Sequence, residues 1–145
     1  MAKPLFISMG LLSFLFGGCA KQPTSPASRF RPGQVWAFTP PANQPNARLT
    51  ILQVESDAKL GTIVHIAISD ISYGNGQNDI KHLPFAEAAI EPSVTQLERE
   101  SGPVPDFANG YREWRNAFDA GKGGIFTITV AEAVDAVLSV VPKGN

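Results

Sequence analysis

Two neighbouring segments rich in β-branched residues constrain the fold of this 145-residue chain most strongly. Residues 48–54 and 62–68 have a strand pattern, and a short, mostly polar stretch joins them, as in a hairpin. Successive side chains of a strand point to opposite faces of its sheet. In the second segment, one face would carry Val64, Ile66 and Ile68, and the other Ile63, His65 and Ala67. The sequence therefore predicts an antiparallel hairpin with one strongly apolar face.

A third, shorter strand is expected before this hairpin. Residues 35–38 read Val-Trp-Ala-Phe, and they lie between a Pro-Gly turn at 32–33 and two prolines at 40–41. Three consecutive strands with short connections most simply form an antiparallel meander. We therefore expect about three strands at the start of the folded domain.

Helical spacing begins at Pro84, a suitable first residue of a helix. The apolar residues that recur at this spacing are Ala86, Ile90, Val94 and Leu97. Pro92 falls inside the stripe, so either one helix is kinked there or two short helices meet. We favour two helices, because Ser93 and Gln96 would form a capping box at the start of the second.

Further helices and one strand complete the predicted domain. An aromatic stripe predicts a helix that ends near Gly121, and its members are Phe107, Tyr111, Trp114 and Phe118. Residues 125–128 are apolar enough for a fourth strand. Thr129 and Glu132 form a capping box before a C-terminal amphipathic helix, whose stripe is Val130, Val134, Val137 and Val141. Strands followed by two or three helices, a strand and a last helix indicate one α+β domain over residues 29–145.

The first nineteen residues are organised like an export signal. Lys3 precedes an apolar run over residues 5–16, which covers roughly 18 Å as a helix and is too short for a bilayer core of roughly 30 Å. Small residues follow, as they do before a signal cleavage site. The run closes with two glycines and Cys19, an arrangement that resembles the lipobox of bacterial lipoproteins, although Phe16 stands where that family more often has Leu.

This resemblance implies that residues 1–18 are a signal peptide and that Cys19 carries a lipid. Ala20 stands in place of the Asp that commonly retains such proteins at the inner membrane, which implies an outer-membrane anchor facing the periplasm. Several acyl chains would hold the protein on the membrane, and residues 19–28 are polar and proline-broken, as in a flexible tether. The alternative is an ordinary secretory signal with a chance cysteine near its end.

The mature part also resembles a small domain found in uncharacterised bacterial proteins. This resemblance rests on residues 110–121, which begin Gly-Tyr-Arg-Glu-Trp, and on residues 126–135. It implies a compact domain shared among bacteria, and it implies no activity.

Charge and cysteine content narrow the possible functions. The chain has 12 Lys and Arg against 13 Asp and Glu, so it offers no basic field to a nucleic-acid backbone. A single cysteine cannot form an internal disulfide or a cysteine-based metal site. The loop over residues 74–79 holds one carboxylate and lacks the ligand spacing of a calcium loop. We therefore expect no nucleic-acid partner, no metal and no cofactor.

Only two histidines are available to a hydrolase, which needs a base, a nucleophile and an orienting group. His65 lies in the middle of a predicted strand, where a structural role is the usual one. His82 is the better candidate, because Asp79 or Glu87 could orient its imidazole from the adjoining loop or helix. The chain contains neither a Gly-x-Ser-x-Gly nor a His-Glu-x-x-His motif.

The aromatic stripe over residues 107–118 has two interpretations. An amphipathic helix forms because its apolar face is buried, so these side chains are expected mainly in the core. They could instead line a groove for a peptide or a glycan, with Tyr111, Arg112 and Arg115 as binding residues.

Three functions stay open at the level of sequence. The first is a lipid-anchored, non-enzymatic interaction or accessory domain that binds an envelope protein or a cell-wall component. The second is a small envelope hydrolase that uses His82 with Asp79 or Glu87. The third is an inhibitor or immunity-type lipoprotein, which rests on analogy alone. The near-neutral charge and the predicted tether favour the first function.

Overall fold

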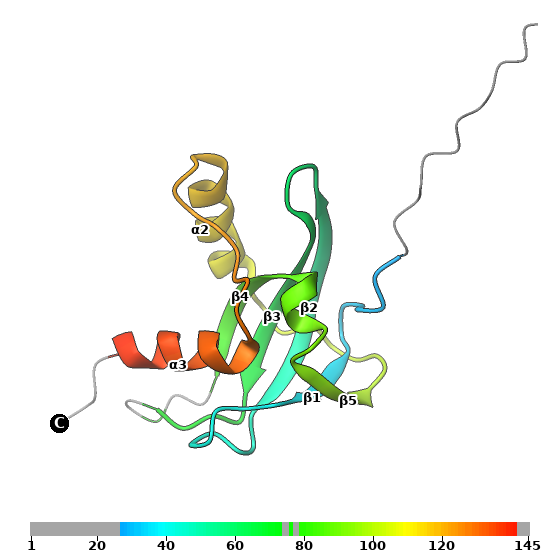
Figure 1. Ribbon diagram of the computed structural model, residues 1–145, viewed down its shortest axis with the longest axis vertical. Helices are drawn as coiled ribbons and strands as arrows, with labels where there is room; N and C mark the ends of the chain where they lie inside the picture. Colours follow the sequence, from blue (N-terminus) through cyan, green and yellow to red (C-terminus); the bar gives the residue numbers. More distant parts are fainter. Residues whose placement is uncertain (1–26, 74–75, 77–78, 142–145) are drawn as a thin grey trace, which may run out of the picture.

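One sheet of five antiparallel strands forms the centre of the domain (Figure 1). The computed structural model describes residues 27–73, 76 and 79–141, so the predicted signal peptide, Cys19 and most of the predicted tether lie outside the described residues. The strand order is β4-β3-β2-β1-β5. The strands are β1 (Val35–Phe38), β2 (Arg48–Asp57), β3 (Gly61–Ser69), β4 (Ile80–Ala86) and β5 (Val94–Arg99), and the helices are α1 (Glu87–Ile90), α2 (Ala108–Asp119) and α3 (Val130–Val140). The predicted α+β class is confirmed.

The predicted meander is also confirmed, since β1, β2 and β3 are consecutive neighbours in the sheet, and β4 extends it. The β2–β3 hairpin closes after the pair Asp57 and Gly61. The Asp57 carboxylate accepts hydrogen bonds from the backbone N–H groups of Lys59 at 2.8 Å and Leu60 at 2.9 Å. Gly61 has a φ of +77°, a left-handed conformation that is strained for residues with a Cβ. The hairpin tip is therefore fixed by its own residues.

The prediction of two helices between Pro84 and Leu97 was wrong. A single helical turn, α1, forms there, and it connects two strands, β4 and β5. β4 pairs with β3, and β5 pairs with the edge of β1 that β2 leaves open. Strand pairing overrides the helical spacing, because each segment satisfies a row of backbone groups at an edge of the sheet. Pro84 is tolerated because β4 is an edge strand of the sheet.

Ser93 and Gln96 do not cap a helix. The Ser93 hydroxyl donates to the carbonyl of Ala89 at 2.8 Å and accepts from the N–H of Val130 at 3.1 Å. Ser93 thus ties the end of α1 to the start of α3. Gln96 lies in β5 opposite Ala37 of β1, so the expected capping box is replaced by a strand.

The two later helices are confirmed, and α3 begins at the predicted capping box. The Thr129 N–H donates to the Glu132 carboxylate at 2.9 Å, and the Glu132 N–H donates to the Thr129 hydroxyl at 3.3 Å. The fourth strand expected over residues 125–128 was wrong, because these residues make only one bridge, between Phe126 and Phe85. α3 begins directly after this segment, which leaves no room for a longer ladder.

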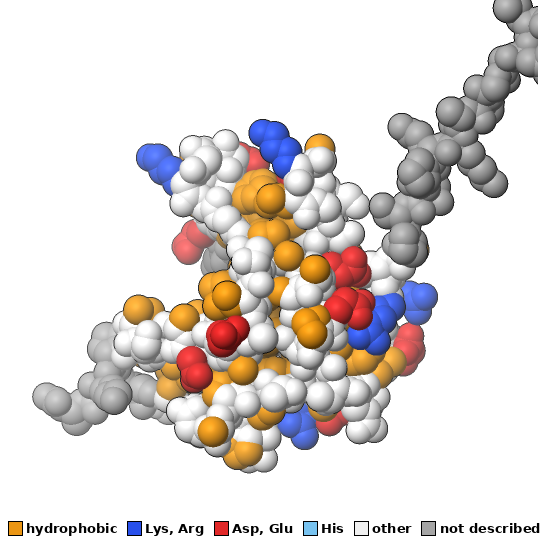
Figure 2. All heavy atoms as spheres, viewed as in Figure 1, with side chains coloured by type: hydrophobic (Ala, Val, Ile, Leu, Met, Phe, Trp, Pro, Cys, Tyr) orange, Lys and Arg blue, Asp and Glu red, His pale blue; other side chains and the backbone are white. Residues whose placement is uncertain are grey.

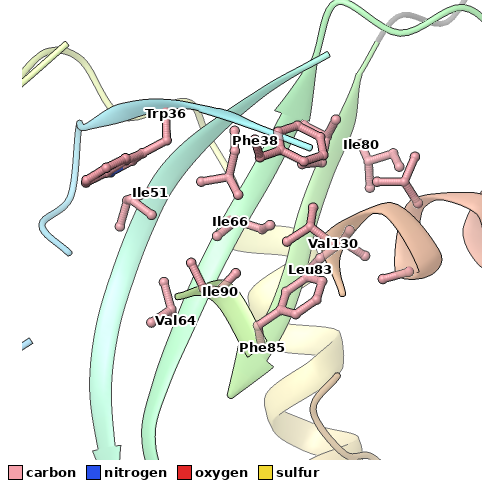
Figure 3. Packing of buried hydrophobic residues seen from close by; sticks show 14 of the residues in the cluster. Trp36, Phe38, Ile51, Val64, Ile66, Ile80, Leu83, Phe85, Ile90 and Val130 are labelled. Atoms are coloured by element: carbon pink, nitrogen blue, oxygen red, sulfur yellow. The ribbon is translucent and has the colours of Figure 1, made fainter. Parts of the chain in front are cut away.

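The main hydrophobic core lies between one face of the sheet and helices α1 and α3 (Figure 3). Ile90 of α1 and Val130 of α3 close over side chains from β2, β3 and β4. The buried strand residues of this core are Trp36, Phe38, Leu49, Ile51, Val64, Ile66, Ile68, Ile80, Leu83 and Phe85. Helix α2 covers the opposite face, and none of its residues is fully buried. The helix that covers this second face is therefore itself partly exposed along its whole length.

Candidate functional site

A pair of histidines lies between the second face of the sheet and α2. His65 of β3 is completely buried, and its Nδ1 lies 2.9 Å from Nε2 of His82 in β4. The ring planes are inclined by only 14°, with centroids 5.1 Å apart, so an N–H of one ring can point at the lone pair of the other. A buried histidine needs a partner for each ring nitrogen, and His82 supplies the first.

The second partner of His65 is the carboxylate of Glu55 in β2. Glu55 Oε1 lies 3.3 Å from His65 Nε2, an ion-pair distance without the direction of a good hydrogen bond, and neither atom has another hydrogen-bond partner among the described residues. Glu55 Oε2 accepts hydrogen bonds from the Tyr111 hydroxyl at 2.9 Å and the Gln53 amide at 3.0 Å. Arg115 adds an ion pair at 3.5 Å. Glu55 is therefore the point at which the sheet and α2 are joined by polar contacts.

The neighbouring groups assign the tautomers of both rings. An ionised carboxylate only accepts hydrogen bonds, so His65 carries its proton on Nε2, facing Glu55, and presents a bare Nδ1. His82 then donates its Nε2–H to His65 Nδ1 and keeps a lone pair on its own Nδ1. The Glu55–His65–His82 network therefore consists of a close carboxylate contact between β2 and β3 and a hydrogen bond between β3 and β4.

A β-bulge in β2 creates this arrangement. Ile51 points toward the main core, and simple alternation would send residues 53 and 55 to the same side. The register shifts between Ile51 and Gln53, so that Gln53 pairs with His65. One extra residue in the strand thus turns Gln53 and Glu55 toward the histidine face.

Aromatic side chains of α2 cover the two histidines. Tyr111 and Trp114 meet the ring of His65 edge-on, at centroid distances of 5.2 and 4.8 Å. Phe107 lies nearly parallel to the ring of His82, with centroids 6.1 Å apart. These contacts exclude water from His65 without burying any residue of α2 completely.

Helix α2 approaches β4 closely at Gly110. A Cβ at this position would lie only 2.9 Å from the Cβ of His82, so a larger residue would push the helix outward. Farther along the helix, the Trp114 indole donates to the carbonyl of Gly124 at 2.8 Å. The aromatic stripe thus packs on the sheet, as its core interpretation expects, but all four members are only half-buried.

Burial keeps both histidines neutral at pH 7. It lowers the pKa of His65, and the adjacent Glu55 carboxylate opposes this shift only in part. Burial, together with the neighbouring His65, lowers the pKa of His82 to about 4. The network therefore combines two neutral imidazoles with the Glu55 carboxylate and the Arg115 guanidinium.

Neither carboxylate that the sequence suggested as a partner of His82 makes a hydrogen bond or ion pair with it in the described part of the chain. Asp79 lines a shallow depression of about 210 Å³ together with Lys81. Glu87 begins α1 and lines a separate depression beside Arg29. The carboxylate that reaches His82 is Glu55, through His65.

Two of the three suggested binding residues belong to the network. Tyr111 and Arg115 contact Glu55, whereas Arg112 donates to Asn109 of its own helix at 2.8 Å. Sequence reasoning missed Gln53 and Glu55. The signal that could have found them is the pair of adjacent apolar residues at 51–52 followed by polar residues at alternate positions, which suits a bulge.

A cleft of about 400 Å³ lies between the tip of the β2–β3 hairpin and the end of α2, which project from the same side of the molecule (Figure 1). Its lining residues are Asp57, Ala58, Lys59, Leu60, Phe118 and Asp119. Leu60 is 46% exposed, which is high for a large apolar side chain. Figure 2 shows hydrophobic side chains gathered between the two projections. The hairpin–α2 cleft is therefore lined by both apolar and charged side chains.

Within the described ranges, no group of three or more His, Cys, Asp or Glu side chains is arranged to hold a metal ion. No helix in the same part of the chain combines the length and apolar character needed to cross a bilayer. Comparisons of the chain with protein-family models, curated proteins and solved structures gave no match.

Proposed function

We propose that the chain is a lipid-anchored, non-enzymatic binding domain of the cell envelope, and that it binds an apolar segment of a partner protein in the hairpin–α2 cleft. The cleft itself is the observation that carries this proposal. It is bounded by two projecting elements, and exposed apolar side chains are enriched at sites of protein recognition.

The chemistry of the cleft favours a protein segment as its occupant. Leu60 of the hairpin and Phe118 of α2 both line it and would contact one or two apolar side chains of a partner. Asp57, Lys59 and Asp119 surround them and would orient polar groups of the partner at the rim. An envelope protein therefore fits this cleft better than a cell-wall glycan, which would need more hydrogen-bonding groups at the centre.

The proposed anchor sets where this binding takes place. A lipid on Cys19 and a tether over residues 19–28 would hold the domain near the outer membrane, facing the periplasm, and would let it search a limited volume. The same geometry suits an inhibitor or immunity-type protein, and the identity of the captured partner distinguishes these two roles.

A hydrolase that uses His82 has less support. Its base would work through Glu55 and His65 rather than Asp79 or Glu87. A pKa near 4 makes His82 a weak base at neutral pH. No Ser, Thr or Cys side chain in the described part of the chain is hydrogen-bonded to it.

Photo-crosslinking from the cleft tests the binding function. A photoreactive residue at position 60 of the full chain, in intact cells, should give one discrete adduct that disappears with Phe118→Ser. The matched control is position 128, because Ile128 is similarly exposed at 42% and lies outside the cleft. The identified partner, once purified, should bind Leu60→Asp at least tenfold more weakly. Equal adducts from both positions, or binding unaffected by Leu60→Asp, would contradict the proposal.

A further inference from the structure

The Glu55–His65–His82 network joins three strands to α2, and the binding cleft does not use it. We propose that this network is a proton-binding site that holds α2 on the sheet while its histidines are neutral and releases α2 when they take up protons. This inference rests on the proposed function, because it describes how binding in the hairpin–α2 cleft would be regulated. Phe118 of α2 lines that cleft, so release of the helix would change it.

The docked arrangement has no suitable place for additional protons. His65 Nδ1 accepts a hydrogen bond from His82 across 2.9 Å, so a proton on this nitrogen would put two N–H groups face to face. A proton on His82 Nδ1 would keep that bond, but it would place a positive charge on a ring that is partly removed from water and lies beside His65. Both routes oppose protonation while α2 is in place.

Release of α2 from the sheet removes both obstacles to protonation. Without α2 above them, the two imidazoles are solvated and take up protons near the ordinary pKa of 6.5. The pKa of each histidine is lowered in the docked form, so docking is complete above about pH 6.5 and weakens as the pH falls toward about 4. The equilibrium constant for release rises up to about tenfold per pH unit for each proton, and so up to about 100-fold for two.

The charged groups that face the histidines act in opposite directions, because the Glu55 carboxylate raises the pKa of His65 and the Arg115 guanidinium lowers it. Glu55 contacts them from β2, and Arg115 of α2 pairs with Glu55. Other charged residues near these contacts are Asp57, Lys81, Asp106 and Asp119. Lys81 and Asp106 carry opposite charges, and Asp119 pairs with Arg115 at 3.8 Å. Acid therefore acts on the attachment of α2 through the two histidines, and Glu55 reduces this effect in part.

Helix α2 is the element that can leave without unfolding the domain. None of its residues is fully buried, whereas the main core on the other face of the sheet contains many residues with no exposed surface. Elements with little buried apolar surface open locally at the lowest free energy. Release of α2 would expose the aromatic stripe and remove one wall of the cleft.

Amide hydrogen exchange of the full chain, followed by mass spectrometry between pH 7.5 and 4.5 and corrected for intrinsic rates, tests this proposal. The opening constant of peptides from α2 should rise more than tenfold between pH 6.5 and 5.5 and should stay well above that of peptides from β3 and α3, which open only with the whole domain. The His82→Gln variant retains a hydrogen-bond donor for His65, but its new side chain cannot be protonated. In this variant the opening constant of α2 should therefore rise at most about tenfold per pH unit.

Two further variants keep the test decisive if His82→Gln perturbs folding. Tyr111→Phe removes one bond to Glu55 and should raise the opening constant of α2 at every pH without changing its slope. Glu132→Gln changes an exposed carboxylate of α3 and should leave the exchange of α2 unaffected. An opening constant of α2 equal to that of the core peptides, or a slope that His82→Gln does not change, would overturn the proposal. No partner is present in this assay, so its failure would leave the binding function standing.

Discussion

The substitution Gly110→Ala has two opposing effects on α2, a gain in helix propensity and a steric clash with His82. Alanine is better than glycine inside a helix by about 1 kcal/mol, so the helix alone would gain from the change. The new Cβ, however, would lie 2.9 Å from the Cβ of His82, a contact that requires α2 or β4 to shift. Overpacking of this kind costs about 1 to 3 kcal/mol. Because the cost of the clash exceeds the gain in helix propensity, we expect the free energy of unfolding to fall by about 1 kcal/mol.

Urea denaturation followed by tryptophan fluorescence measures this change, because Trp114 lies on α2 beside His65. The matched control is Asn116→Ala, an exposed position of the same helix, which should gain up to about 0.7 kcal/mol from helix propensity. If Gly110→Ala stabilises the protein as Asn116→Ala does, α2 does not rest on His82 as described.

Four further outcomes are expected. Phe85→Ala should lower the free energy of unfolding in urea by about 3 to 5 kcal/mol, because Phe85 is fully buried in the main core. Thr129→Ala removes the N-cap of α3 and should lower it by about 1 kcal/mol in the same assay. Lowering the pH from 6.5 to 4 should reduce stability in urea by on the order of 2 kcal/mol through His82, after allowance for the solvent that reaches this half-buried ring, and His82→Gln should remove that part. Cys19→Ser should move the protein from the detergent phase to the aqueous phase on Triton X-114 partitioning, and unchanged partitioning would contradict the proposed lipid anchor.

Local elements of this fold could be predicted from the sequence better than the pairing of distant strands. The β2–β3 hairpin, α2 and the capping box of α3 were predicted correctly, because alternation, an aromatic stripe and the Thr129–Glu132 pair act over a few residues. Residues 94–99 were misassigned because β5 is specified by the open edge of β1, more than fifty residues earlier. Such long-range pairing cannot be recognised from the local spacing of apolar residues.

The candidate site was only partly visible for the same reason. Tyr111, Arg115 and His82 stood out as polar groups near predicted helices or loops, and each has a place in or beside the network. Glu55 did not stand out, because the bulge that turns it toward His65 depends on the register between β2 and β3. A one-residue shift in that register would have placed the carboxylate on the face of the main core.

Titration of the histidine side chains by nuclear magnetic resonance tests the described network most directly. Nitrogen chemical shifts should identify an unprotonated Nδ1 on both rings at pH 7, with His82 titrating near pH 4 and His65 below 6.5. His82→Gln should alter the nitrogen shifts of His65, because the two rings share one hydrogen bond. Two histidines that titrate independently near pH 6.5 would contradict the buried Glu55–His65–His82 network.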